Sequence, residues 1–197
     1  MRTLLICISI VWCTNSLAQK KGESKNEIDL KKSRVEWTGK KLTGEHYGEI
    51  NISQGYLVFS KTRLTSGHFE MDMNSITCTD ITDEKSNRRL VDHLKSDDFF
   101  SASKFPHAKF EISSVEHKSE NNYLITGNLS IKGNTSTLSF PATVVSINGE
   151  LTAKATMVFD RSKYDIKFGS QSFFENLGDK LVYDDIEIKV ELILITK

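Results

Sequence analysis

Asp97 and Asp98 are two adjacent carboxylates whose chemical type could support general acid and base catalysis. Neighbouring side chains in a strand or a turn point apart, whereas a catalytic carboxylate pair needs a fixed separation across the reacting bond. No partner at such a fixed spacing is visible in the sequence. We therefore expect the pair to cap a helix end or a turn rather than to catalyse a reaction.

The histidines are too widely spaced to form a metal site within one element, since no two of them lie at i, i+2 or i, i+4. The five residues are His46, His68, His93, His107 and His117. A metal site would need ligands that converge from separate elements, and Asp72 and Asp92 nearby do not complete a ligand set that we recognise. We therefore predict no metal site.

Nucleophilic catalysis has an equally weak basis in the sequence. Cys78 has no neighbour that would lower the pKa of its thiol, so a buried structural thiol is favoured over a nucleophile. Ser170 and Ser172 lie in GSQSF, which lacks the G-x-S-x-G pattern and the strand-to-helix turn of a hydrolase nucleophile. The sequence thus contains no motif that indicates a hydrolase.

Length and composition point to one domain that binds something apolar. A chain of 197 residues fits a single all-β barrel. The 26 basic and 26 acidic residues cancel, so no long-range field would draw the protein to nucleic acid or to an anionic membrane. Eleven phenylalanines against five tyrosines supply mostly rings without a polar handle, which favour burial or an apolar ligand.

Residues 1–18 have the pattern of a cleaved signal peptide. Arg2 provides a short positive region, Leu4 to Trp12 form an apolar stretch too short to span a bilayer, and Ala18 ends a small-residue cleavage site. The sequence therefore predicts export, to a periplasm or to the medium, without an integral membrane span. Lipidation at Cys13 is not expected, because Trp12 stands where a small residue is required.

Cleavage would leave Cys78 as the single cysteine, so no internal disulfide could form and stability must come from the core. Residues 19–26 are polar and charged without an apolar period, which predicts a flexible leader. Residues 27–197 then form the folded domain.

Strands are the elements that dominate this domain. Phe69, Met71 and Met73 fall on one face of a strand, while Glu70 falls on the opposite face, which we expect to be exposed to solvent. Such a row of apolar side chains forms either ordinary core or a barrel wall that contacts an apolar ligand. A later strand places Met157 and Phe159 on one face with small alanines that leave room, and Pro141 indicates an edge or a strand end.

The spacing of apolar residues changes from that of a strand to that of a helix once, between residues 82 and 95. Asp80 or Thr82 could cap a helix there, and Leu90, Val91 and Leu94 form its apolar edge. About eight alternating strands with one main helix predict an all-β fold, an antiparallel eight-stranded lipocalin-like barrel. A barrel of that size can hold one small ligand.

Three segments carry a family resemblance. The stretch from Arg89 to Phe110, which contains DHLKSDDFFSASKFPHAKF, resembles the signature of the YceI-like family of exported, lipocalin-like polyisoprenoid-binding proteins. Tyr123 to Gly133, YLITGNLSIKG, resembles the family's G-x-L-T-I-x-G strand and turn, and Asp160 to Asp185 resembles its C-terminal hairpin. The resemblance covers roughly Ile28 to Ile195.

The resemblance implies a cavity along the barrel axis that holds an isoprenoid chain, of quinone or polyprenyl type, for carriage or sequestration. It implies no cofactor apart from that lipid, and it makes a homodimer plausible. Two alternatives stay open at this point: an exported enzyme of unknown reaction on the same barrel, and a structural or stress-related interaction protein. We expect the ligand contacts to be apolar residues on the inner faces and at a closing edge: Phe69, Met71, Met73, Phe99, Phe100, Phe110, Met157, Phe159 and Phe173.

Overall fold

The computed structural model describes residues 22–195. The predicted signal peptide, its cleavage site and Cys13 lie outside the described residues. In the part of the chain that is described, no helix has the length and apolar character needed to cross a membrane.

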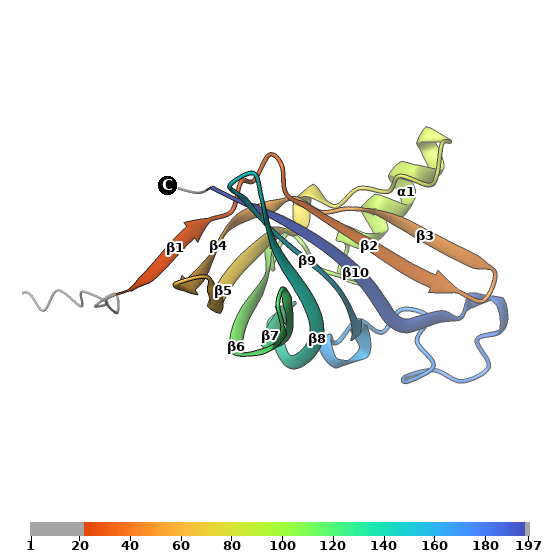
Figure 1. Cartoon of the computed structure of the whole chain (residues 1–197). Coiled ribbons are helices and arrows are strands. Elements are labelled where there is room, and N and C mark those ends of the chain that lie inside the picture. Colours follow the sequence, from red (N-terminus) through yellow and green to blue (C-terminus); the bar gives the residue numbers. More distant parts are fainter. Residues whose placement is uncertain (1–21, 196–197) are drawn as a thin grey trace, which may run out of the picture.

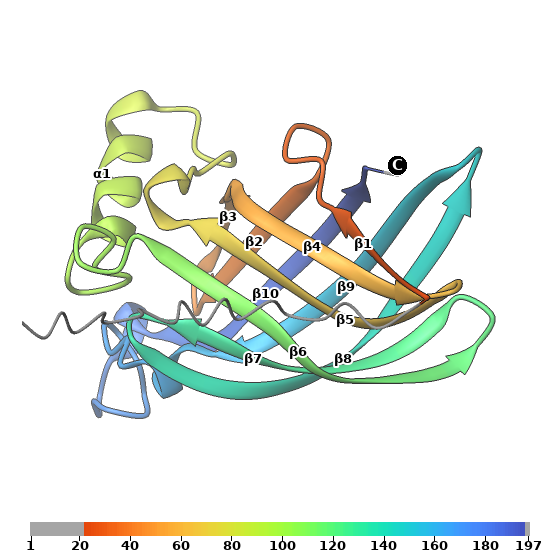
Figure 2. The same cartoon turned by 90° about the vertical axis from the view of Figure 1, so that its left-hand side faces the viewer.

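The described chain forms one antiparallel sheet that curls into a lipocalin-like barrel, which confirms the predicted fold class (Figures 1 and 2). The sheet order is β1-β4-β5-β6-β7-β8-β9-β10-β2-β3, so β4 to β10 follow each other as an up-and-down meander and β2 returns to the outer edge of β10. The strands are β1 (Glu23–Glu27), β2 (Arg34–Lys41), β3 (Gly44–Glu49), β4 (Ile52–Ser60), β5 (Arg63–Asp72), β6 (His107–Ser119), β7 (Asn122–Ile131), β8 (Asn134–Ile147), β9 (Glu150–Asp160) and β10 (Val182–Leu194).

The sheet has ten strands rather than the predicted eight, for two reasons. The chain divides at residues 50–51, so that β3 pairs with β2 while β4 pairs with β5. In addition, the predicted flexible leader is wrong from Glu23 onward, because β1 pairs with β4 from Glu23↔Ser60 to Glu27↔Tyr56. An edge strand of this kind is held by backbone hydrogen bonds and needs no apolar face, which is why the polar sequence concealed it.

Helix α1 (Glu84–Lys95) lies at one end of the barrel, close to its predicted place (Figure 2). Its N-cap is Asp83, which lies three residues after Asp80 and one residue after Thr82, the two predicted caps. The Asp83 carboxylate accepts a hydrogen bond from the backbone N–H of Ser86 at 2.9 Å. Leu94 is buried, and Leu90 and Val91 pack against the core. Three short 3₁₀ helices, η1 (Met73–Ser75), η2 (Arg161–Tyr164) and η3 (Gly178–Lys180), complete the helical elements of the described chain.

The outer edge of β3 is covered by the segment that leads from η1 to α1. Backbone N–H groups of Thr77 and Thr79 donate to the carbonyls of Glu49 and Tyr47, both at 2.9 Å. The two backbones approach so closely that a Cβ on Gly48 would lie 1.9 Å from the carbonyl oxygen of Thr77. Only glycine fits at this position, and the covered edge cannot pair with another chain.

Pro141 marks the point where β8 changes its neighbour. β8 pairs with β7 from Asn134 to Thr143, but its pairing with β9 begins only at Ala142. Pro141 therefore lies within a long strand, at the end of the stretch of β8 that pairs with β7 but not with β9. Because this stretch has no bonds to β9, the missing N–H of Pro141 removes none. The sheet is open at this place, and η2 packs near it.

Candidate functional site

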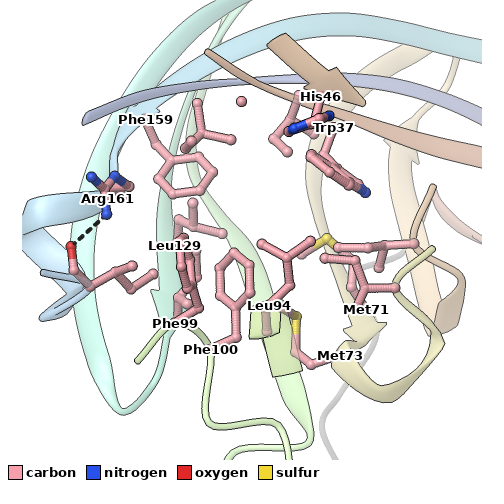
Figure 3. Close-up of a pocket in the computed structure, with 18 of the residues that line it drawn as sticks. Trp37, His46, Met71, Met73, Leu94, Phe99, Phe100, Leu129, Phe159 and Arg161 are labelled. Carbon is pink, nitrogen blue, oxygen red and sulfur yellow. Dashed lines mark hydrogen bonds between the residues drawn. The ribbon is translucent and has the colours of Figure 1, made fainter. Parts of the chain in front are cut away.

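A cavity of about 240 Å³ opens inside the barrel near α1. Its walls are almost entirely apolar, and Figure 3 shows aromatic and methionine side chains pointing into the space from several strands and from the helical end. Eight of the nine predicted contact residues line it: Phe69, Met71, Met73, Phe99, Phe100, Phe110, Met157 and Phe159. Their role in binding stays a prediction, but the structure brings them together.

The strand walls follow from alternation and register. Phe69 pairs with Phe110 and Met71 pairs with Ala108, so both positions of β5 share an inward face with β6. The Phe69 and Phe110 rings lie 5.5 Å apart between centroids, tilted by 41°. The small side chain of Ala108 opposite the flexible Met71 leaves the space that the cavity occupies.

Phe99 and Phe100 close the cavity at the helical end. The chain leaves α1 through a tight turn in which the backbone N–H of Phe100 donates to the carbonyl of Leu94 at 3.1 Å. Phe99 is buried and Phe100 is half-buried, as expected for a plug between the helix and the barrel. The turn is stabilised by Asp97, which accepts hydrogen bonds from the Ser101 hydroxyl and, at 2.6 Å, from Lys104 Nζ.

Asp97 and Asp98 do not form a catalytic pair. Hydrogen bonds from Lys104 and Ser101 lower the pKa of the Asp97 carboxyl, which keeps it ionised as a turn-capping group. Asp98 instead approaches His93, with 3.4 Å between its Oδ2 and the imidazole Nε2. The geometry thus supports the expected capping role for Asp97, whereas Asp98 contacts His93 instead.

Phe173 does not line the cavity. Its side chain is 43% exposed, in the long loop between η2 and η3, and Lys167 Nζ lies 5.3 Å from its ring centroid. The phenylalanine of this loop that does line the cavity is Phe168. The sequence predicts Phe173 at the closing edge, whereas the structure places Phe168 there, because an irregular loop has no periodicity that assigns faces to its side chains.

The expectation that the outer face of β5 is exposed to solvent is wrong at Glu70, which is buried. Its side chain is 9% exposed and lies between Lys109 Nζ at 3.0 Å and His68 Nε2 at 3.1 Å. Burial acts to raise the pKa of the Glu70 carboxyl, but hydrogen bonds from Lys109, Gln54 and His68 outweigh it and lower the pKa. The register Glu70↔Lys109 places a lysine directly across the strand pair, so the residue is covered by its partners.

Trp37 and His46, which sequence reasoning did not select, belong to the wall contributed by β2 and β3. Trp37 Nε1 donates to the Thr77 carbonyl at 2.9 Å, which fixes the indole against the segment that covers β3. His46 lies near Trp37 on the same wall (Figure 3). Its Nδ1 is 2.8 Å from Asp80 Oδ2.

Asp80 is held by several partners at once. Burial acts to raise the pKa of its carboxyl, but hydrogen bonds from His46, from the Tyr47 backbone and from the Cys78 thiol lower it. Cys78 is buried, which raises the pKa of its thiol. The carboxylate thus lies between thiol and imidazole, so the imidazole is not placed to take the thiol proton, and Cys78 is a structural thiol here.

Arg161, on η2, is the fully buried cation of this end of the barrel, with 1% of its surface exposed. Its guanidinium donates to the carbonyls of Tyr183, Ile166 and Val182 and lies 3.2 Å from Asp184 Oδ1. Burial lowers the pKa of the guanidinium, opposed by Asp184 and Asp160. Figure 3 shows Arg161 at the cavity wall, and its dashed line marks one of the backbone hydrogen bonds of the guanidinium.

A second, smaller space of about 50 Å³ continues along the barrel interior. Phe69, Phe110, Met157 and Val190 line both spaces and so form the partition between them. The two spaces therefore meet at these four side chains.

Comparison with known proteins agrees with this architecture. The family described as YceI-like domain matches residues 27–194. A UPF0312 protein of Shewanella denitrificans is 33% identical over 98 residues, and this match spans about half the length of each chain.

Among solved structures, BcnA of Burkholderia cenocepacia is similar with a TM-score of 0.70 at 24% identity, covering 84% of this chain and 98% of that one. A polyisoprenoid binding domain from Saccharophagus degradans, implicated in plant cell wall breakdown, gives a TM-score of 0.64 at 11% identity. The match covers 87% of this chain and 98% of that domain. A YceI protein of Campylobacter jejuni gives 0.53 at 18% identity, with 68% and 75% covered. At these identities the structural likeness shows the fold alone.

Proposed function

This chain belongs to the YceI-like family, and from that premise we propose that it binds a long apolar lipid, an isoprenoid of quinone or polyprenyl type, inside its barrel for carriage or sequestration. The observation that carries the proposal is the cavity itself, whose walls come from residues far apart in the sequence and are nearly free of polar atoms. The polyisoprenoid binding domain of Saccharophagus degradans, which has the same fold, supports the choice of an isoprenoid.

The energetics suit a ligand that is recognised by its shape and apolarity. Burial of apolar surface contributes about 25 cal/mol per Å², or about 0.8 kcal/mol for each buried CH₂ group. An isoprenoid tail has no polar groups that the protein could recognise. The aromatic and methionine side chains of the walls supply adaptable contacts for its methyl branches. A cavity of about 240 Å³ is slightly below the usual range of about 300–1,000 Å³ for ligand sites. A long tail would therefore extend into the second space or out of the mouth.

The enzyme alternative lacks a constellation to support it among residues 22–195. The Cys78 thiol, His46 and Asp80 are close together, but the thiol donates to the carboxylate at 3.2 Å and is not paired with the imidazole. A nucleophile would need a base within hydrogen-bond reach and a lowered pKa. We therefore keep binding as the proposed function.

The place of action that we propose is outside the cytoplasm. It rests on residues 1–18, whose short positive region, apolar stretch and cleavage site have the pattern of an export signal. An isoprenoid would need a carrier in that aqueous space, because its tail is insoluble in water. A homodimer stays a prediction from the family resemblance.

The decisive experiment is extraction of the protein, purified from its exported fraction, with organic solvent, followed by mass spectrometry. We expect a stoichiometric isoprenoid lipid. Met71→Asp, which places a carboxylate in the cavity wall, is the matched variant that should lose the lipid, with circular dichroism as the check on folding. Repeatedly empty protein that also fails to take up offered quinone or polyprenol would overturn the proposal.

A further inference from the structure

The inward face of β2 changes from apolar to cationic at the cavity mouth. Val35, Trp37, Gly39 and Lys41 occupy alternate positions and so share one face. Val35 and Trp37 are buried, whereas Lys41 is half-buried and lines the cavity at its rim. No carboxylate lies within ion-pair distance of Lys41 Nζ in the described part of the chain.

Across from this face, β3 contributes His46. It pairs directly with Gly39, so its imidazole shares the inward face, and it is diagonal to Lys41, at a spacing of about 7–8 Å between backbones that long side chains can span. Asp80 holds His46 Nδ1, which leaves Nε2 for a second partner. Because Gly39 has no side chain, nothing from β2 stands between the two groups.

Among the other polar side chains of the lining, Arg161 and His93 are already engaged, and Lys40 is exposed on the opposite face of β2. Arg161 is neutralised by Asp184 and bonded to three backbone carbonyls. His93 faces Asp98. None of the residues that line the cavity is acidic. Lys41 is therefore a cation beside an apolar cavity, where its hydration is reduced and no protein group supplies the opposite charge.

We propose that the ligand is an anionic amphiphile: its isoprenoid tail lies in the cavity, and a terminal phosphate or carboxylate lies on Lys41 Nζ, with His46 Nε2 beside it. This inference rests on the proposed lipid-binding function and narrows its ligand class. A neutral quinone head would leave the Lys41 ammonium without a counter-charge. An anionic head forms a charge-assisted hydrogen bond with the ammonium, in a place partly shielded from water.

Three probes with the same tail test the inference: geranylgeraniol, geranylgeranoic acid and geranylgeranyl phosphate, each added to delipidated mature protein. Trp37 lines the cavity and, once the predicted signal peptide with Trp12 is removed, is the single tryptophan, so its fluorescence reports binding. We expect the two anionic probes to bind at least about tenfold more tightly than the alcohol at low ionic strength. Tighter binding of the phosphate alone would support the inference and narrow the head to phosphate.

Lys41→Met should reduce the preference for the anionic probes to near unity while the affinity for the alcohol is kept. Lys61→Met is the matched control, because Lys61 lies in the β4–β5 turn, at the end of the barrel opposite α1 (Figure 2). Equal affinity for all three probes, or an anionic preference that persists in Lys41→Met, would overturn the inference and leave the proposed function in place. Failure of all three probes to bind would instead count against the proposed function.

Discussion

The imidazole of His93 on α1 lies edge-to-face against the ring of Phe168, with 4.5 Å between the ring centroids and an interplanar angle of 87°. Phe168 belongs to the loop after η2, so this contact joins the helix to the loop at the end of the cavity. Phe99 contacts both rings, at 5.0 Å from His93 and 5.4 Å from Phe168. We refer to His93, Phe99 and Phe168 as the aromatic closure. Since Phe168 is 44% exposed, it is the outermost member.

Removing this outer ring should speed ligand release. Phe168→Ala deletes an aromatic contact worth about 0.5–1.5 kcal/mol beyond its buried area, so we expect release about 2- to 12-fold faster with little change in stability. Stopped-flow displacement of a bound fluorescent lipid measures the rate. Phe174→Ala is the control, because Phe174 is 49% exposed in the same loop and does not line the cavity. Equal rates for the two variants would show that the aromatic closure does not limit release.

The partition between the two interior spaces should set the length of the bound tail. Phe110→Ala removes a ring that lines both spaces, and we expect the variant to prefer longer isoprenoids than the parent does. Phe140→Ala is the comparison, since Phe140 lines only the smaller space. Both changes cost about 3–5 kcal/mol of stability, so binding is compared at a temperature where both variants are folded. An unchanged chain-length profile in Phe110→Ala would contradict this division of the cavity.

Alternation in the sequence was sufficient to predict the barrel and most of the cavity wall. In β5 and β9 it assigned Phe69, Met71, Met157 and Phe159 to the inner face, because a strand's period of two leaves only one choice once the apolar set is known. It failed where periodicity carries no information. β1 is polar and pairs with β4 without an apolar face of its own. The loop containing Phe168 is irregular, and Glu70 is covered by cross-strand partners whose identity depends on register.

Glu70 gives a prediction for the pH dependence of stability. Its pKa in the folded protein lies below the ordinary value of 4.5, so the stability it contributes is present above pH 4.5 and is lost as the pH falls through the folded pKa. Glu70→Gln should be less stable than the parent by about 1–2 kcal/mol at pH 7, because hydrogen bonds to a charged group are replaced by neutral ones. The difference should shrink as the pH falls toward about 3.

Urea unfolding at several pH values measures this difference, and lipid uptake at pH 7 should be unchanged, since Glu70 points away from the cavity. Glu116→Gln is a suitable control, because Glu116 pairs with Lys118 on an exposed surface, where such pairs contribute little. A pH-independent gap between parent and Glu70→Gln would show that the carboxylate is not stabilised by folding.

Arg161 and Asp184 should determine whether the long loop that carries Phe168 stays in place. Asp184 balances the buried guanidinium and also accepts hydrogen bonds from the hydroxyls of Ser170 and Ser172, at 2.9 and 2.7 Å. Asp184→Asn keeps the shape but removes the counter-charge, and breaking a buried pair in this way typically costs about 3–5 kcal/mol.

We expect Asp184→Asn to unfold at lower urea and to lose protection from hydrogen exchange first in residues 165–181, ahead of the strands. Asp185→Asn is the matched control, because Asp185 is the next residue and is exposed. Arg161→Met combined with Asp184→Asn should recover part of the loss, because it removes the uncompensated buried cation together with its partner. If exchange rises uniformly over the barrel, the pair stabilises the whole fold and does not act through the loop. A loss confined to residues 165–181, together with faster lipid release, would show that this buried pair holds the aromatic closure against α1.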